Sequence, residues 1–202
     1  MTTLARFTIA AAALAAAACG RADESREAAR ASADSAAQRA LADRCTRGAA
    51  RLTAGGIGAV RLGARLADVA AACTVRDTAL ELEGTPERAH VVEIGGGRVV
   101  AVTSGTADTS VVRIDVADPA FRTENGAGVG QTLGDLRRAH GRICALAGEG
   151  RMVVQAASLP GISFGTAAAV TPAATRDPAA LPDSVRIERA WITEAQSACG
   201  AS

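Results

Sequence analysis

The chain has 202 residues, of which 50 are Ala, 21 are Gly and 22 are Arg, and it contains neither Lys nor Tyr. The absence of Lys excludes a P-loop lysine, a Schiff-base lysine and a Ser–Lys catalytic pair. Four aromatic residues are too few for a nucleic-acid stacking platform, and the two His residues argue against a His-rich metal site.

The N-terminus has the pattern of an export signal. Residues 1–18 place one positive charge, Arg6, before an Ala-rich run that is too short for a permanent membrane span of roughly 20 residues. Residues 16–20, with the sequence AAACG, resemble the lipobox of bacterial lipoproteins, although the usual Leu three positions before the Cys is Ala16. The resemblance implies lipidation of Cys19 and a membrane-anchored lipoprotein that faces the periplasm or the cell exterior. Ordinary signal cleavage, which gives a soluble periplasmic protein, is the alternative.

Five Cys residues are an odd number for an exported protein. If Cys19 carries a lipid, an even set remains for an oxidising compartment, namely Cys45, Cys73, Cys144 and Cys199. Of the three possible pairings we predict Cys45–Cys73 and Cys144–Cys199, because each bridge then closes within one half of the body. Removal of residues 1–18 leaves 21 Arg and 21 acidic residues, so nucleic acid and an anionic membrane surface are not expected as the main partner.

Residues 19–50 are predicted to be a lipid-anchored tether or a marginal helix. Between residues 20 and 50 the composition is dominated by Ala, Arg, Asp, Glu and Ser, and Leu41 is the one large aliphatic residue. Such a segment has helix propensity but no wide apolar stripe that could pack on a core.

The remaining chain contains an internal repeat. The pattern apolar-Gly-x-x-Leu-x-Asp-apolar occurs at residues 62–69 and again, 67 positions later, at residues 129–136. A second match follows in the same order, in which residues 112–114 (VRI) parallel residues 185–187 (VRI) at an offset of 73. We interpret the body as two modules, residues 51–118 and 119–202. The matched motif residues are Gly63 and Gly130, Leu66 and Leu133, and Asp68 and Asp135.

Each motif predicts a bend at its Gly followed by a short helix, because Leu and apolar residues recur at helical spacing after it. In the second copy, Thr132 and Asp135 have the spacing of a capping box, and Gly141 is a candidate C-cap. Strands are predicted at residues 90–94, 98–103, 111–116, 143–147, 152–156, 162–164 and 185–192, with turns at 95–97 and 148–150 and a loop over 166–183. The predicted fold is α+β, with two tandem modules, each a short helix followed by a three- or four-stranded antiparallel meander.

The Gly-x-x-Leu-x-Asp-apolar helix start, repeated before β-meanders in an exported lipoprotein, resembles the superfamily of the β-lactamase inhibitor proteins and the small outer-membrane-assembly lipoproteins. The resemblance covers residues 51–202. Residues 121–130 and 160–164 are also similar to uncharacterised exported bacterial proteins. The inhibitor family binds its target through aromatic-rich sheet surfaces. Only three aromatic residues remain after processing here, so neither a target nor a binding residue is carried over.

The motifs that resemble catalytic ones lack the required context. Residues 161–165 fit G-x-S-x-G, but no His follows Ser163, and a strand residue after a Pro-Gly bend explains the pattern. His140 is interpreted as a core or cap-proximal residue, and Asp68 and Asp135 as carboxylates that compensate helix dipoles. The Cys residues form no C-x-x-C pair. We therefore predict no catalytic, cofactor-binding or metal-binding residues.

The sequence thus predicts a non-enzymatic bacterial envelope lipoprotein that binds another envelope protein and no nucleic acid. A periplasmic small-ligand-binding protein that uses a crevice between the modules is the alternative, and a serine hydrolase is the third hypothesis. An apolar patch rimmed by Arg on one sheet face favours the first, and a deep pocket with convergent polar groups favours the second. His90 or His140 within hydrogen-bond reach of Ser163 favours the third.

Overall fold

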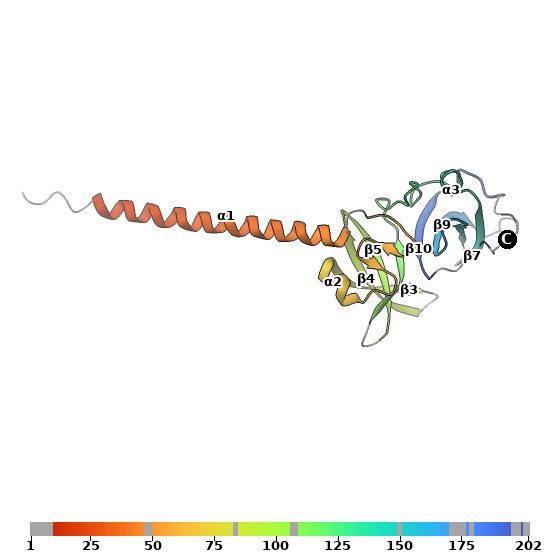
Figure 1. Ribbon diagram of the computed structural model, residues 1–202, viewed down its shortest axis with the longest axis horizontal. Coiled ribbons are helices and arrows are strands. Elements are labelled where there is room, and N and C mark those ends of the chain that lie inside the picture. Colours follow the sequence, from red (N-terminus) through yellow and green to blue (C-terminus); the bar gives the residue numbers. More distant parts are fainter. Residues whose placement is uncertain are drawn as a thin grey trace, which may run out of the picture. The chain divides into compact units, whose positions relative to one another are not determined.

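The computed structural model describes residues 10–46, 50–82, 85–105, 109–148, 151–169, 177, 180–194 and 199. The chain forms two compact units, Met1–Ala40 and Leu41–Ser202. The elements in chain order, labelled in part in Figure 1, are α1 (Ala10–Thr46), β1 (Gly56–Ile57), β2 (Val60–Arg61), α2 (Leu66–Ala72), β3 (Thr74–Leu82), β4 (Thr85–Ile94), β5 (Gly97–Ser104), β6 (Ser110–Val116), α3 (Leu133–His140), β7 (Ile143–Gly148), β8 (Arg151–Ala156), β9 (Ile162–Ala169) and β10 (Ile187–Ile192).

The first unit consists, in its described part, of α1 as far as Ala40. The side chains from Ser25 to Ala40 are all exposed, in keeping with a composition that offers no apolar stripe. Within the described residues, no helix is long and apolar enough to cross a membrane. Residues 1–9 of the predicted signal and the side chain of Cys19 lie outside the described part of the structure.

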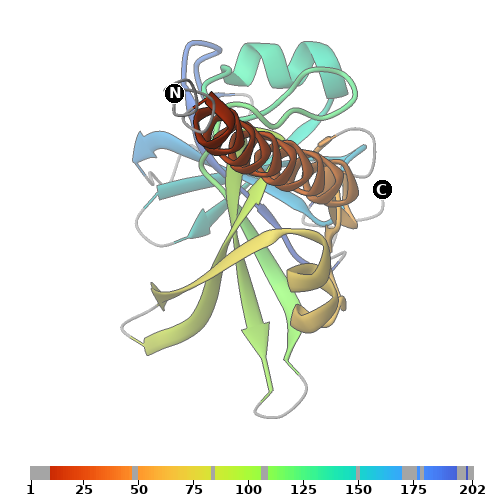
Figure 2. The same ribbon diagram turned by 90° about the vertical axis from the view of Figure 1, so that its left-hand side faces the viewer.

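The second unit is built on one antiparallel sheet of eight strands in the order β3-β4-β5-β6-β10-β9-β8-β7. The strands of the first half follow one another up to β6, and those of the second half follow one another up to β10. β6 and β10 then pair in the middle of the sheet. A separate hairpin of β1 and β2 precedes α2, and Figures 1 and 2 show α2 and α3 well apart from each other in this unit. The predicted α+β class is confirmed.

Alternation along the strands gives the sheet an inner and an outer face. On β5, the inner-face residues Gly97, Val99 and Ala101 are buried, whereas Arg98 is exposed and Val100 is half-buried on the outer face. The inner face is part of a core that also contains Val69 of α2 and Leu133 of α3. Aliphatic residues make up most of this core, as the composition predicts.

Two glycine turns form matching hydrogen bonds in the two halves. Gly63, with a φ of 76°, donates its N–H to the carbonyl of Val111 at 2.7 Å. Gly130, with a φ of 84°, donates its N–H to the carbonyl of Ile187, also at 2.7 Å. Both residues therefore form the predicted bend with the positive φ that favours Gly. Each bend ties the start of its helix to the central strand of its own half.

The same contacts correct the predicted register of the repeat. Since Gly63 bonds Val111 and Gly130 bonds Ile187, the two central strands correspond at an offset of 76 and not 73. A bulge lies between Val111 and Arg113 in β6, and one lies between Ile187 and Arg189 in β10. Relative to these bonds and bulges, the position of Arg113 in its half matches that of Arg189, three residues beyond the predicted Arg186. A three-residue motif was too short to fix the alignment across a long loop.

The helix caps agree with the sequence in the second half. Asp135 donates its backbone N–H to the Thr132 hydroxyl at 3.2 Å, and the Asp135 carboxylate accepts the Thr132 N–H at 2.9 Å. This is the predicted capping box, and it holds the pKa of Asp135 below its usual value. Gly141 is the C-cap with a φ of 72°. At α2 the N-cap is Arg65, without a side-chain cap hydrogen bond, and Asp68 lies in the first turn.

Several strand assignments differ from the prediction, among them β4, which begins at Thr85 rather than at residue 90. β3 was not predicted, because its sequence TVRDTALEL has polar residues on both faces. β9 continues to Ala169, into the segment predicted as a loop. Gly97 belongs to β5 rather than to the preceding turn, and a Cβ there would lie 2.8 Å from the Phe121 ring. The predicted turn at 148–150 lies partly outside the described residues.

The structure contains both predicted disulfides. Cys45, in the last turn of α1, is bonded to Cys73, the C-cap of α2, with a Cα separation of 4.8 Å. Cys144 of β7 is bonded to Cys199, with a Cα separation of 5.3 Å. Disulfides persist in oxidising compartments, and these two indicate an exported, non-cytoplasmic protein.

Candidate functional site

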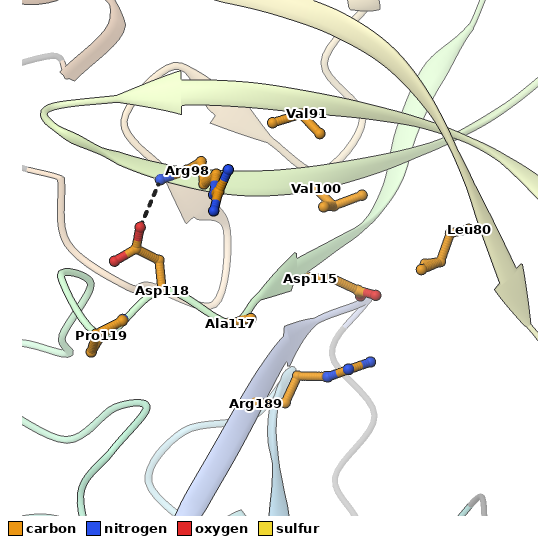
Figure 3. Close-up of a pocket in the computed structure, with 9 residues that line it drawn as sticks. All are labelled: Leu80, Val91, Arg98, Val100, Asp115, Ala117, Asp118, Pro119 and Arg189. Atoms are coloured by element: carbon orange, nitrogen blue, oxygen red, sulfur yellow. Dashed lines mark hydrogen bonds between the residues drawn. The ribbon is translucent and has the colours of Figure 1, made fainter.

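The outer face of the sheet contains a hollow of about 460 Å³ (Figure 3). β3, β4, β5, β6, β10 and the segment after β6 contribute to it. The register explains its floor, since Val91 lies opposite Val100 and Val100 lies opposite Asp115 on neighbouring strands. We call this site the outer-face hollow; it is lined by Leu80, Val91, Arg98, Val100, Asp115, Ala117, Asp118, Pro119 and Arg189.

One carboxylate of the hollow is already neutralised. The Arg113 guanidinium donates from Nε to Asp115 Oδ1 at 2.5 Å and from a terminal nitrogen to Oδ2 at 3.1 Å. Both oxygens of Asp115 are thus bound in a forked pair, and its side chain is only 8% exposed. The guanidinium carbon also lies 5.6 Å from the centre of the Trp191 ring. Asp115 therefore contributes little free negative charge to the hollow.

Two cationic groups at the hollow have no anionic partner among the described residues. The side chains of Arg98 and Arg189 are exposed, and within the described part of the chain neither guanidinium forms an ion pair or a hydrogen bond. Asp118 is close to Arg98 but accepts the backbone N–H groups of Arg98, at 3.1 Å, and Ala120, at 2.9 Å (Figure 3). The hollow thus combines an apolar floor with two unpaired guanidinium groups.

The two Gly residues of the G-x-S-x-G pattern have structural reasons. Gly161 has a φ of 81°, in the turn before β9. Gly165 lies beneath Trp191, because a Cβ at this position would be 2.6 Å from the indole ring. Ser163 lies inside β9, opposite Trp191, with no strand-to-helix turn around it. The pattern therefore makes room for Trp191 and does not form a nucleophile elbow.

Neither His is paired with Ser163. His90 is buried, and its Nδ1 lies 2.9 Å from Asp77 Oδ1 while its Nε2 lies 3.2 Å from the Thr103 hydroxyl. The order of groups is that of a catalytic triad, but Thr103 is also buried. These contacts satisfy the hydrogen-bonding groups of a buried imidazole. Among the described residues, no group of three or more His, Cys, Asp or Glu residues could hold a metal ion.

His140 lies at the end of α3, beside a second hollow of about 650 Å³. Its Nε2 is 3.0 Å from the Thr123 hydroxyl, and its Nδ1 is 3.3 Å from the Ser158 hydroxyl. The Thr123 oxygen also accepts the Ala127 N–H. Both ring nitrogens are therefore engaged within the protein, as expected for a residue close to the core. Burial holds the pKa of His140 below its usual range.

This shift predicts a pH dependence of stability. The lowered pKa means that the unfolded chain binds a proton at His140 at pH values at which the folded protein does not. The free energy of unfolding is therefore highest above about pH 6.5, the ordinary pKa of His. As the pH falls below that value, the free energy of unfolding decreases by at most about 1.4 kcal/mol per pH unit. Urea unfolding measured between pH 5 and 8 should show that the free energy of unfolding changes less with pH in His140→Gln than in the wild type. Equal slopes in the two proteins would contradict the assignment.

Comparison with protein-family models finds no match, and comparison with curated proteins finds none either. Among solved structures, the chain is similar to the uncharacterized protein yfeY from Escherichia coli. The likeness has 18% sequence identity and a TM-score of 0.49, and it covers 71% of this chain and 99% of that chain.

The sequence indicated which residues of this unit are structural but not where a site lies. Leu133 of the repeat motif is buried and Leu66 is half-buried, while Gly63 and Gly130 are in turns. The residues of the outer-face hollow come from five strands and the segment after β6, and no local motif marks them. The one available signal was the conspicuous single Trp of an aromatic-poor chain, since Trp191 lies next to Arg113 at this face.

Proposed function

We propose that this protein is a bacterial envelope lipoprotein without catalytic activity, and that it binds another protein through the outer-face hollow. The observation that carries the proposal is the apolar floor beside the unpaired guanidinium groups of Arg98 and Arg189. Apolar surface rimmed by polar groups is typical of protein-binding sites, and Arg is enriched in their centres. This is the arrangement that the sequence analysis associated with the protein-binding hypothesis.

The chemistry of the hollow also describes the partner segment. Leu80, Val91 and Val100 are only half-buried, so an apolar side chain of a partner would complete their burial. Arg98 and Arg189 would each accommodate a carboxylate, because guanidinium groups bind carboxylates in a forked geometry. The expected partner segment is therefore an apolar side chain flanked by Asp or Glu.

The arrangement of the two halves supports a tandem duplication. Matching glycine turns, matching bulges and the mirrored strand order are consistent with two helix-plus-meander modules over residues 51–118 and 119–202. In this alignment Arg113 corresponds to Arg189, and Asp115 corresponds to Trp191. The first copy thus pairs its Arg with a carboxylate, whereas the second has an indole at that position. The replacement of the acid by Trp191 accounts for the unpaired Arg189.

A small-ligand-binding protein is the second candidate. A volume of about 460 Å³ falls within the range of roughly 300–1,000 Å³ that small-molecule sites have. The ligand would be an amphipathic anion, with its carboxylate between Arg98 and Arg189. We favour a protein partner, because Arg98, Ala117, Pro119 and Arg189 are exposed at the rim and would not enclose a small molecule.

Export and anchoring complete the proposal. The AAACG sequence and the even set of disulfide-bonded Cys support lipidation of Cys19. Intact-mass analysis of the membrane-extracted protein should find a chain that starts at Cys19 and carries a diacyl or triacyl adduct. A chain that starts elsewhere without an adduct would refute the anchor.

Site-specific photo-crosslinking in cells tests the binding surface. A photoreactive residue at Val100, in the hollow, should form a discrete adduct with a second protein, and one at Val91, opposite Val100 in the hollow, should give the same adduct. A matched photoreactive residue at Ala67, exposed on α2, should not. The same adduct from Ala67, or none from the two hollow positions, would contradict the proposal.

A further inference from the structure

The two edges of the sheet differ in their protection. At one edge, β7 has six residues, and its Cys144 is cross-linked to Cys199 near the C-terminus. At the other edge, β3 has nine residues and pairs with β4 without a bulge from Thr74 to Leu82. β3 contains no Pro, and in the described part of the chain its backbone bonds only to β4. Long, regular and uncovered edges bind other strands unless they are blocked.

The register shows which backbone groups of β3 point outward. In an antiparallel pair, every second residue exchanges N–H···O bonds with the residue opposite. Pro86 of β4 has no N–H and lies opposite Glu81, so Glu81 is not in a bonded pair with β4. By alternation, the bonded pairs involve the even-numbered residues of β3. The outward N–H and C=O groups are those of Val75, Asp77, Ala79 and Glu81.

The outward positions also carry a charge pattern. Asp77 and Glu81 lie on the same face of β3, four residues apart, and both are exposed. Within the described residues Glu81 has no ion-pair partner. Asp77 contacts His90 while its side chain stays 93% exposed. A strand added beside β3 would therefore gain from basic side chains at the two positions opposite these acids.

The same pattern disfavours a second copy of this chain as the added strand. In a two-fold symmetric antiparallel pair of β3 strands, opposite residues share a face. The carboxylates of Asp77 and Glu81 from both copies then become direct or diagonal neighbours in every central register. Like charges at these positions are destabilising. The edge is complementary to a different, basic strand.

We propose that β3 binds an extended segment of another protein as an additional antiparallel strand, with Arg or Lys opposite Asp77 and Glu81. Main-chain hydrogen bonds to the four outward residues hold the segment, and the two acids select its sequence. The site is the outward edge of β3. Leu80 of the same strand also lines the outer-face hollow, but this proposal does not rest on the function proposed for the hollow.

The test uses the full-length protein and a synthetic peptide of defined sequence. The acetylated and amidated peptide Arg-Ile-Val-Thr-Arg-Glu-Val places its two Arg residues opposite Glu81 and Asp77 when it pairs antiparallel to β3. In an amide NMR titration, the signals of Val75, Asp77, Ala79 and Glu81 should shift more than those of Arg76, Thr78 and Leu80. A control peptide with Glu in place of both Arg residues should bind at least tenfold more weakly.

Two variants separate strand addition from other modes of binding. Ala79→Pro removes an outward N–H that β4 does not use and should weaken the peptide at least tenfold, whereas Ala79→Ser should bind like the wild type. Glu81→Arg should weaken binding of the original peptide and strengthen binding of a peptide with Glu in place of the first Arg. This reversal introduces no Pro into β3, so it tests the site even if Ala79→Pro fails to fold. The proposal would be overturned if the NMR shifts were confined to Arg98 and Val100, or if Ala79→Pro bound the peptide as the wild type does. It would also be overturned if the protein self-associated and Ala79→Pro abolished that self-association.

Discussion

Replacement of Cys45 and Cys73 by Ala should lower the free energy of unfolding by about 3.6 kcal/mol, and replacement of Cys144 and Cys199 by about 4.2 kcal/mol. These values follow from the loop-closure entropy that each bridge removes from the unfolded chain, for sequence separations of 28 and 55. The first bridge ties the last turn of α1 to the end of α2, and the second ties the C-terminal part to β7.

Urea unfolding under non-reducing conditions measures both losses. Both double variants and their reference protein carry Cys19→Ala, which removes the proposed lipid and leaves both bridges in the reference. The three proteins then differ in the bridges alone. A loss below about 1 kcal/mol for both double variants would show that the bridges add little to the stability of the fold.

Asp115→Ala should destabilise the protein by about 3 kcal/mol, because it leaves the Arg113 guanidinium without its carboxylate. We expect the lower end of the usual range, since the Arg113 side chain is 21% exposed. The double variant Arg113→Leu with Asp115→Leu should lie within about 1.5 kcal/mol of the wild type, because no uncompensated charge remains.

A double-mutant cycle by chemical denaturation, built from Arg113→Leu, Asp115→Leu and their combination, separates these cases. The two single replacements should together cost more than the double replacement, which is the signature of a coupled pair. Strict additivity would show that Arg113 and Asp115 stabilise the sheet independently, despite both carboxylate oxygens being bound.

Local features of the fold were predictable because their chemistry lies within a few residues. The bends at Gly63 and Gly130 need a positive φ, and the capping box joins residues three apart. The disulfides followed from assigning each pair of Cys to one half of the chain. β3 was missed for an equally physical reason, since an edge strand with polar residues on both faces lacks the apolar alternation by which strands are recognised.

The outer-face hollow could not be predicted, because it depends on registers between strands that are distant in sequence. Val91, Val100, Asp115 and Trp191 lie in one row across four strands only because of the observed pairings. The match of residues 112–114 with 185–187 misplaced this row by three residues. The observed hydrogen bonds and registers place Arg113 in the sheet position that matches Arg189, and Asp115 in the position that matches Trp191.

The most direct measurement of the proposed binding role is the yield of the Val100 photo-crosslink in a charge-reversed protein. With Arg98→Glu and Arg189→Glu, the hollow would repel an acidic partner segment, and we expect the adduct to fall at least about tenfold. The matched control, Arg39→Glu with Arg61→Glu, changes the net charge equally at two exposed positions outside the hollow and should leave the yield unchanged. An undiminished adduct in the hollow variant, or an equal loss in the control, would contradict binding through the outer-face hollow.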